Sequence, residues 1–492
     1  MRMKAPDLAL LPRSSALIGG EAGHGSGAEI AHIYPATGAP TASLRLSSPA
    51  DVDHAVAAAR AAAPAWRAMT GDKRRDLMFK LAAAIEGDIA RLAHLSTIEN
   101  GSAAMTAPYM AMDAAQKFRY FGGWADKIHG RTVATWGGPA HDYVAYEPYG
   151  TIGAIIPWNG PLFATTMVVA PALAAGNCVI VKSPDIAPWA VLRFGELALA
   201  AGFPAGVVQV VTGGAEVGEA MVAHPGIDKI QFVGSGATAK KVLTAAAQTL
   251  KPCGLELGGK SAVIVFADAD LPDAAKRGLS GAISANGQGC VNGTRLLVER
   301  PVYEAYLAML GAMAGQIPVG DPLDPASVMG PVISQGALDR ISGIVDRAVA
   351  QDGARLVTGG GRMGGEFAAG FFLPLTILAD VANGTALAQH EVFGPVLAVT
   401  PFDSEDEAVA LANGTDYGLG GYVHTQNLAR GHRVAGALDA GMIHVNGAGE
   451  GMTPCVPFGG MKQSGFGRLG GEEGLKEFLR VKNVWINLAG PK

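Results

Sequence analysis

Residues 178–214, CVIVKSPDIAPWAVLRFGELALAAGFPAGVVQVVTGG, contain two short β-rich runs separated by a segment of helical composition. The runs are CVIVKSP and GVVQVVTGG, and the segment between them is WAVLRFGELALAAG. Two parallel strands need a crossover of about a dozen residues or more, usually a helix, and this segment has that length. The stretch therefore predicts a βαβ unit within a parallel sheet.

The same alternation continues on both sides of this unit. TIGAIIPW precedes it and IDKIQFVGSG follows it, so a doubly wound α/β sheet is expected from Gly150 onward. A second series starts with SAVIVFADADL at Ser261 and runs through TRLLVER, FFLPLTILAD and HEVFGPVLAVTPF to GMIHVNG. Apolar residues at helical spacing predict a helical, peripheral segment over about the first hundred residues. The fold prediction is an α/β protein of two such lobes with a cleft between them.

Composition restricts the class of protein. The chain has 492 residues, 49% of them hydrophobic and 16% charged, which is typical of an ordered globular protein of two or three domains. The net charge is −5, and no Lys/Arg cluster alternates with aromatics, so nucleic acid is not an expected partner. The most apolar stretch, TTMVVAPALAAGNCVIV, contains Pro171, Gly176 and Asn177 and is too short for a membrane span. No membrane partner is expected.

Four cysteines, Cys178, Cys253, Cys290 and Cys455, are widely spaced and form no CxxC pair. This spacing argues against a metal site or a disulfide framework and indicates a reducing cytoplasm. Cys290 differs from the others because it lies in NGQGCVNGTR, where glycines at 287, 289 and 293 permit positive φ and close approach to a ligand. A free thiol has a pKa of about 8.5, so a nucleophile here needs nearby amides or a helix start. The residues alone leave a structural cysteine and a nucleophile as alternatives.

Two further residues are candidates for catalysis. Glu256 lies between Leu255 and Leu257, where burial would raise its pKa toward neutrality, as a general base at pH 7 requires. An exposed loop carboxylate or a structural partner of Lys260 is the alternative. Asn159, in IIPWNGPL, follows a predicted strand in a turn bounded by prolines. Its amide could donate to a developing oxyanion or could bond its own backbone.

A possible nucleotide site follows another predicted strand. In IQFVGSGATAKK a Gly-Ser-Gly turn opens a helix, where backbone N–H groups could face a phosphate. The dinucleotide fingerprint is not met, because Ala239 stands where its third glycine would be. Lys182 and Asp185, at the end of CVIVK, could bond ribose hydroxyls. An ordinary βα loop and a solvated pair of charges are the alternatives.

In their order along nearly the whole chain, these segments resemble the aldehyde dehydrogenase superfamily, in its hydrolytic branch that does not acylate coenzyme A. The similar segments are GWADKIHGRT, IIPWNGPL, AAGNCVIVKSPD, GFPAGVV, FVGSG, LELGGKS, NGQGCVNGTR, EVFGPV, VNG and PFGGMKQSGFGR. The interval of 34 residues from Glu256 to Cys290 is also similar to that of the family.

The resemblance implies catalytic roles and a cofactor. Cys290 would be the nucleophile, Glu256 the general base and Asn159 the oxyanion donor, acting with the backbone N–H of Cys290. NAD is the implied cofactor, and NADP is less favoured because the negative charge of Asp185 would repel a 2′-phosphate. The implied cofactor-binding residues are Ile156, Pro157, Trp158, Lys182, Asp185, Gly214, Gly218, Phe232, Gly234, Ser235, Leu257, Glu391 and Phe393.

The resemblance also implies the wall of a substrate pocket. The implied lining residues are Gly160, Phe163, Ala164, Met167, Ser284, Val291, Met452 and Phe458. Several are small and none is charged, so the expected substrate is an apolar aldehyde: aromatic, terpenoid or long-chain. A coenzyme A-acylating enzyme, a semialdehyde dehydrogenase and a catalytically silent structural relative are the alternatives. Many relatives carry Glu where Leu469 follows Arg468, so a proton relay through that position is absent.

The same resemblance implies three parts. They are an NAD-binding domain of residues 1–126 and 148–257, a catalytic domain of residues 258–463, and a bridging and oligomerisation element of residues 127–147 and 464–492. The bridging element implies a homodimer or homotetramer.

Overall fold

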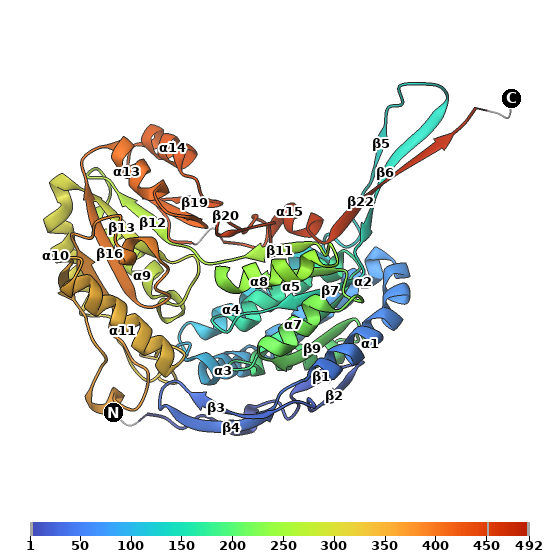
Figure 1. The fold of residues 1–492 in the computed structure, drawn as a ribbon, viewed down its shortest axis with the longest axis horizontal. Helices are drawn as coiled ribbons and strands as arrows, with labels where there is room; N and C mark the ends of the chain where they lie inside the picture. Colours follow the sequence, from blue (N-terminus) through green and yellow to red (C-terminus); the bar gives the residue numbers. More distant parts are fainter. Residues whose placement is uncertain (1–2, 450–451, 490–492) are drawn as a thin grey trace.

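The computed structural model describes residues 3–449 and 452–489. Over these residues the chain forms two α/β lobes and a three-stranded antiparallel sheet that projects from the body of the molecule and carries the C-terminal end (Figure 1). The prediction of two lobes with largely parallel sheets is confirmed.

The first lobe contains an eight-stranded sheet with the order β2-β1-β9-β8-β7-β10-β11-β21. Its strands are β1 (Ala16–Ile18), β2 (Glu21–Gly23), β7 (Thr151–Ile155), β8 (Cys178–Pro184), β9 (Val208–Gly213), β10 (Lys229–Val233), β11 (Cys253–Glu256) and β21 (Gly465–Phe466). The five central strands, β7 to β11, are parallel, whereas β1, β2 and β21 pair antiparallel at the edges. This is the sheet predicted from Gly150 onward.

Helices cover both faces of this sheet. Gln209 on β9 donates from its Nε2 to the carbonyl oxygen of Ala55 on α1, 2.7 Å away, while the next residue, Val210, packs against Gly195 on α6. Because successive strand residues point to opposite faces, α1 and α6 lie on opposite sides. The helices of this lobe are α1 (Pro49–Ala68), α2 (Gly71–Gly87), α3 (Ile89–Asn100), α4 (Ala107–Gly122), α5 (Pro161–Ala174), α6 (Trp189–Ala200), α7 (Ala215–Ala223), α8 (Gly236–Ala247) and α15 (Gly471–Lys476).

The N-terminal region is less helical than expected. Before α1 the chain forms β1 and β2, which extend the first sheet, and a separate antiparallel pair, β3 (Glu29–Tyr34) and β4 (Ala39–Arg45). β1 has only three residues, too few to show a periodic pattern, and it is held by pairing with β9, Ala16 opposite Val211. The helical prediction holds for residues 49–100 and is wrong for the segment before them.

The second lobe contains a seven-stranded sheet with the order β14-β15-β16-β13-β12-β18-β19, parallel except for β14. Its strands are β12 (Ser261–Val265), β13 (Gly293–Glu299), β14 (Arg355–Thr358), β15 (Thr376–Ala379), β16 (Val396–Phe402), β18 (Gly420–His424) and β19 (Met442–Val445). β17 (Tyr417–Gly418) and β20 (Met461–Lys462) form a separate two-stranded antiparallel sheet. The helices are α9 (Leu271–Ile283), α10 (Tyr303–Ala314), α11 (Gln335–Ala350), α12 (Ala386–Gln389), α13 (Glu405–Asn413) and α14 (Leu428–Ala437).

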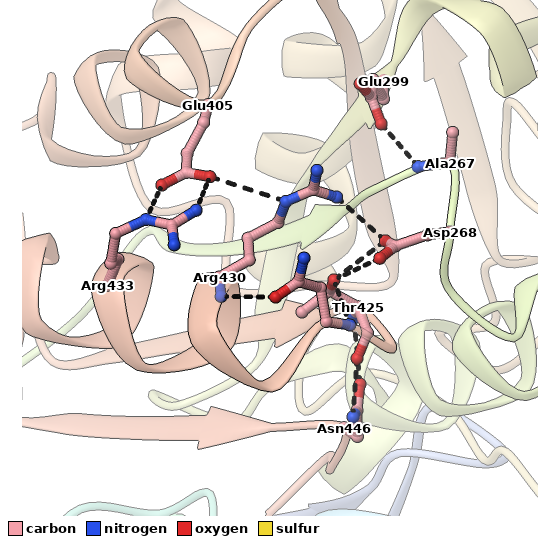
Figure 2. A network of polar contacts seen from close by, with 9 residues as sticks. Ala267, Asp268, Glu299, Glu405, Thr425, Arg430, Arg433 and Asn446 are labelled. Carbon is pink, nitrogen blue, oxygen red and sulfur yellow. Dashed lines mark hydrogen bonds and ion pairs between the residues drawn. The ribbon is translucent and has the colours of Figure 1, made fainter.

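A polar network ties together the segments that follow β12, β18 and β19 (Figure 2). Thr425 donates from its hydroxyl to Asp268 at 2.8 Å, and Arg430 bonds the same carboxylate at 3.0 Å. Asn446 donates from its amide to the carbonyl oxygen of Thr425 at 2.9 Å. Arg430 also pairs with Glu405, 3.5 Å away. The network therefore connects α13 and α14 to the ends of three strands.

The projecting sheet has the order β22-β6-β5 and consists of β5 (Arg131–Val133), β6 (Ala140–Pro148) and β22 (Leu479–Asn487). β22 pairs with β6 along its whole length, from Leu479 opposite Pro148 to Asn487 opposite Ala140. The predicted bridging segment, residues 464–492, begins before Leu479, where β22 starts. β21 pairs with β11 in the first sheet, so residues 465–466 belong to the first lobe.

Candidate active site

A cavity of about 390 Å³ lies where residues of the two lobes meet. The first lobe contributes Pro157, Trp158, Asn159, Gly160, Phe163, Ala164, Met167, Val233, Gly234, Ser235, Glu256, Leu257 and Gly258. The second part of the chain contributes Cys290, Arg340, Glu391, Phe393 and Phe458. The predicted nucleophile, base and oxyanion donor therefore line one cavity.

The loop that carries Cys290 is held by its own amide side chains. Asn286 donates to the carbonyl oxygens of Gly101 and Pro331 at 2.8 and 2.9 Å, and Gln288 accepts from the backbone N–H of Ile333 at 3.0 Å. Asn292 donates to the carbonyl oxygen of Ser284 at 3.0 Å. These side-chain amides therefore bond the backbone and fix the loop.

The glycines of this loop serve two different purposes. Gly287 has φ of +80°, a left-handed conformation that favours glycine. Gly289 and Gly293 are needed for space instead, because a Cβ there would lie 2.3 Å from Asn292 Oδ1 and 2.4 Å from Val263 Cγ2. The expectation of positive φ thus applies to Gly287, and close packing explains the other two.

The protein groups around Cys290 favour its neutral thiol over the thiolate. Burial raises the pKa of its thiol to about 12, and the carboxylates of Glu391 and Glu256 act in the same direction. The backbone N–H groups of Cys290 and Val291 oppose this rise of the pKa. Cys290 lies in a turn after a short 3₁₀ helix, Ser284–Gly287, and not at a helix start. A nucleophilic role therefore requires a base.

Glu256 is placed to be that base. It is the last residue of β11, is only 3% exposed, and neither carboxylate oxygen has a hydrogen-bond partner among the described residues. Burial raises its pKa well above 4.5, although the positive charge of Arg468 partly opposes the rise. A carboxylate whose pKa is raised holds a proton more tightly and is therefore a stronger base. The segment SGFGR packs beside it, since Gly465 pairs with Glu256.

Asn159 lies between β7 and α5, just before the helix begins at Pro161. Its Nδ2 donates to the carbonyl oxygen of Gln288, 2.8 Å away, and Asn100 donates to the carbonyl oxygen of Asn159 at 3.3 Å. A side-chain amide carries two N–H donors, so one remains for another acceptor. The bond to Gln288 connects Asn159 directly to the cysteine loop.

The predicted adenosine-side residues lie together at the ends of β8 and β9 but do not line the cavity. The stem of Lys182 passes Gly218, where a Cβ would lie 3.7 Å from Lys182 Cδ, and a Cβ at Gly214 would lie 3.5 Å from the Asp185 carboxylate. Lys182 donates to the carbonyl oxygen of Gly213 at 2.6 Å, and burial lowers its pKa to about 8. Gly214 and Gly218 therefore lie directly beside the charged pair Lys182 and Asp185.

The remaining predicted cofactor residues fall into two groups. Pro157, Trp158, Gly234, Ser235, Leu257, Glu391 and Phe393 line the cavity. Ile156, directly after β7, and Phe232, on β10, are buried, 2% and 4% exposed, and do not line the cavity. Trp158 and Phe393 meet edge to face at 5.4 Å, and Gly259 donates its N–H to Glu391 at 3.0 Å. Burial raises the pKa of Glu391 to about 7.

The predicted pocket wall is divided between two cavities. Gly160, Phe163, Ala164, Met167 and Phe458 line the first cavity. A second cavity of about 210 Å³ shares Asn159, Gly160 and Phe163 with the first and includes Ser284.

Two predicted pocket residues, Val291 and Met452, are not among the residues that line either cavity. Their side chains are partly buried and pack against the core of the first lobe.

Several lining residues were not named as candidates in the sequence analysis. Val233, Gly258 and Arg340 line the first cavity, and Met105 and Met110 line the second. Arg340 lies on α11, and no quoted motif contains it. Gly258 could have been found, because it belongs to the LELGGKS segment beside Glu256.

Within the described ranges, no group of three or more His, Cys, Asp or Glu side chains is placed to hold a metal ion. No helix formed by these residues is both long and apolar enough to cross a bilayer.

The site combines a cysteine and a buried carboxylate at the junction of two α/β lobes, beside strand ends of the kind that bind nucleotides. A cysteine and a carboxylate around one cavity are the groups that a two-lobed enzyme with a nucleophile and a base would need.

Comparison with known proteins identifies the family. Residues 23–484 match the aldehyde dehydrogenase family. Betaine aldehyde dehydrogenase 1 of Rhizobium meliloti is 38% identical over 98% of both chains, and human retinal dehydrogenase 2 is 38% identical over 92% of this chain and 88% of its own. A crystal structure of Staphylococcus aureus betaine aldehyde dehydrogenase in complex with NAD⁺ superposes with a TM-score of 0.95 at 32% identity, covering 99% of this chain and 97% of that one. The chain belongs to the aldehyde dehydrogenase family and is an oxidoreductase that acts on aldehydes.

Proposed function

We propose that the protein oxidises an apolar aldehyde to the carboxylic acid with NAD as its cofactor, through a thiohemiacetal and a thioester on Cys290. The observation that carries the proposal is the placement of Cys290, Glu256 and Asn159 around one cavity that also contains Glu391 and Phe393. The alternative of a catalytically silent relative loses support, because it predicts a missing nucleophile or base.

The residues present fit NAD. Lys182 and Asp185 would hold the adenosine ribose beside Gly214 and Gly218, where only hydrogen atoms occupy the space of a side chain. Ser235 begins α8 and would place its helix start near the phosphates. Glu391, Trp158 and Phe393 would lie at the nicotinamide end. The relative from Staphylococcus aureus, which binds NAD⁺, supports this assignment.

When bound, NAD would supply the acceptor for the hydride that leaves the thiohemiacetal carbon as its oxyanion collapses to a thioester on Cys290. Glu256 takes the proton of the Cys290 thiol, and the resulting thiolate attacks the carbonyl carbon. The free N–H of Asn159 and the backbone N–H of Cys290 donate to the oxyanion that forms. Loss of one such donor typically costs about 3–4 kcal/mol of transition-state stabilisation.

Glu256 acts a second time in hydrolysis. After the first proton has passed to solvent, its carboxylate accepts a proton from a water molecule, which attacks the thioester carbonyl. The carbon–sulfur bond breaks, the acid is released and Cys290 regains its proton. A buried carboxyl with a raised pKa suits both steps, since it is a stronger base than an exposed carboxylate.

The second cavity supports an uncharged substrate. None of the residues that line it is charged, and they include Met105, Met110, Leu162 and Phe163. A dicarboxylic semialdehyde would leave its second carboxylate without a cation there, which is costly away from water. The named relatives act on betaine aldehyde and on retinal, so family membership alone does not choose the substrate.

The proposal is tested by following absorbance of NADH with benzaldehyde, a medium-chain aldehyde and succinic semialdehyde, without coenzyme A. The first two should give the higher kcat/KM. Much higher efficiency with succinic semialdehyde would refute the apolar pocket, and a requirement for coenzyme A would refute hydrolysis.

The role of Glu256 is tested by Glu256→Gln. This variant should form NADH only slowly and stall after about one equivalent per active site, because thiol activation and thioester hydrolysis both need the base. Cys290→Ala is the matched control and should give no burst. Sustained turnover by Glu256→Gln would contradict the assignment.

A further inference from the structure

A buried cation lies behind the wall of the active site. Lys117 on α4 is 5% exposed, and its ammonium forms an ion pair with Asp113, one helical turn earlier. Lysine is rarely buried without a specific partner, because its charge loses hydration there. The catalytic steps described above do not use either residue.

The ammonium of Lys117 also lies over an aromatic ring. Its Nζ is 3.6 Å from the centroid of the Phe163 ring, on the first turn of α5. A cation above an aromatic face is attracted by the electron-rich ring, and the attraction strengthens when water is excluded. Asp113 fixes the ammonium on one side and the ring of Phe163 accepts it on the other. This contact therefore couples α4 to α5.

Phe163 is placed to influence which aldehydes fit the site. It lines both the cavity around Cys290 and the uncharged second cavity. Phe458, another residue of the first cavity, meets the Phe163 ring at 6.5 Å and 69°. The orientation of the Phe163 ring therefore sets the passage that the aldehyde side chain must occupy.

We propose that Lys117 is a positioning residue for substrate choice: anchored by Asp113, its ammonium holds the ring of Phe163 against the substrate passage. The proposal rests on the function proposed above and adds a determinant of specificity to it. An aromatic or branched aldehyde needs a ring that is already in place, because ordering the ring during binding would reduce affinity. A short aldehyde such as propanal offers little surface to pack against the ring, so we expect it to be much less sensitive to the ring's orientation.

The test is a double-substitution cycle on a ratio of substrates. Lys117→Met keeps a long side chain and removes the charge, and Phe163→Leu removes the ring. The measured quantity is kcat/KM for benzaldehyde divided by that for propanal. Lys117→Met should lower this ratio about tenfold, chiefly through KM for benzaldehyde, with kcat for propanal unchanged.

The cycle separates positioning from a general structural role. In the Phe163→Leu protein, Lys117→Met should leave the ratio unchanged, because the ring through which Lys117 acts is gone. An equal fall with and without the ring, or an unchanged ratio in Lys117→Met alone, overturns the proposal. Lys117→Arg should restore most of the ratio by keeping a cation over the ring.

Two further measurements test the same proposal without relying on the kinetics of Lys117→Met. If Lys117→Met does not fold, Asp113→Asn should still lower the ratio, since the ammonium loses its anchor, and an unchanged ratio there overturns the proposal. Crystal structures of the parent and Lys117→Met proteins should show one ring orientation of Phe163 in the parent and several in the variant. One shared orientation overturns the proposal even if the aldehyde preference proposed above proves wrong, so the two failures are distinguishable.

Discussion

Asp185 is the residue that we expect to determine the preference for NAD over NADP. Its carboxylate lies against Gly214 and accepts the N–H of Ile186 at 3.0 Å. Asp185→Asn retains the hydrogen-bonding shape and removes the charge that would repel a 2′-phosphate. The ratio of kcat/KM with NADP to that with NAD should rise about tenfold, which corresponds to about 1.4 kcal/mol.

Steady-state kinetics with both cofactors measure this ratio. Glu219→Gln, which removes one charge from an exposed position on α7, is the control and should leave it unchanged. An unaltered ratio in Asp185→Asn would show that the carboxylate does not face the adenosine ribose.

Glu99 is another buried carboxyl group, and it takes no part in the proposed catalytic steps. It is 0% exposed, and it accepts the backbone N–H groups of Trp189 and Ala190 at 2.6 and 3.2 Å, at the start of α6. Burial nevertheless raises its pKa to about 8, because the charged form loses hydration. His32 bonds the carbonyl oxygen of Glu99 at 3.1 Å, and burial lowers its pKa to about 4.

The raised pKa of Glu99 predicts how stability depends on pH. Between the unfolded pKa of 4.5 and the folded pKa of about 8, the folded protein holds a proton that the unfolded chain has lost, so stability falls as pH rises. The slope for one such group approaches about 1.4 kcal/mol per pH unit. Glu99→Gln stays neutral and removes this contribution.

Urea unfolding at pH 7 and pH 8 measures the difference between the variant and the parent, and His32 is present in both proteins, so its contribution cancels in this difference. The advantage of Glu99→Gln should grow with pH. A constant difference would mean that Glu99 is ionised in the folded protein already at pH 7.

Some of these residues could be selected as candidates from the sequence, and others could not. Cys290, Glu256 and Asn159 each lie in a recognisable segment, so their roles could be predicted. The partners of the cysteine loop could not, because Asn286 bonds Gly101 and Pro331, 185 and 45 residues away. The position of Lys117 over Phe163 depends in the same way on the packing of two helices.

At the scale of elements, the network in Figure 2 predicts where the second lobe can be weakened without loss of catalysis. Asp268 accepts from Thr425 and pairs with Arg430, whose guanidinium also lies 4.5 Å from the centroid of the Phe266 ring. Asp268→Ala leaves Thr425 and Arg430 without this partner. Removing these bonds should lower the free energy of unfolding by about 1–3 kcal/mol.

Thermal unfolding and kcat/KM measured together check this prediction. Asp268 does not line either cavity, so activity at low temperature should stay within about twofold of the parent while Tm falls. Asp270→Ala, which removes the side chain that accepts the N–H of Asp273 at the start of α9, is a comparison at a single helix cap. Loss of activity at full stability would contradict a structural role for the network.

Which elements could be predicted depends on their length and environment. β8, β9, β12 and β16 are buried apolar runs, and such runs are visible in the sequence. β1 and β21 have three and two residues, and they exist as strands because β9 and β11 offer them hydrogen bonds. Short strands of this kind depend on the rest of the fold.

At the scale of the whole molecule, the sheet of β22, β6 and β5 projects from the body (Figure 1), and it carries apolar side chains that a monomer would leave in water. Val481 and Trp485 on β22 are 66% and 52% exposed, and they lie on the same face because side chains alternate along a strand. Contiguous exposed apolar residues commonly mark a protein interface. We therefore expect a homo-oligomer in which this face meets another copy of the chain.

The double variant Val481→Asp with Trp485→Asp should dissociate this oligomer, because two carboxylates per chain would lose hydration in the contact. Light scattering coupled to size-exclusion chromatography should show a smaller mass than for the parent. Leu250→Asp is the control: it places a carboxylate on an apolar residue that is 89% exposed on the loop after α8, and it should leave the mass unchanged. A parent protein that is already monomeric, or a double variant of unchanged mass, would show that this face of β22 remains in contact with solvent.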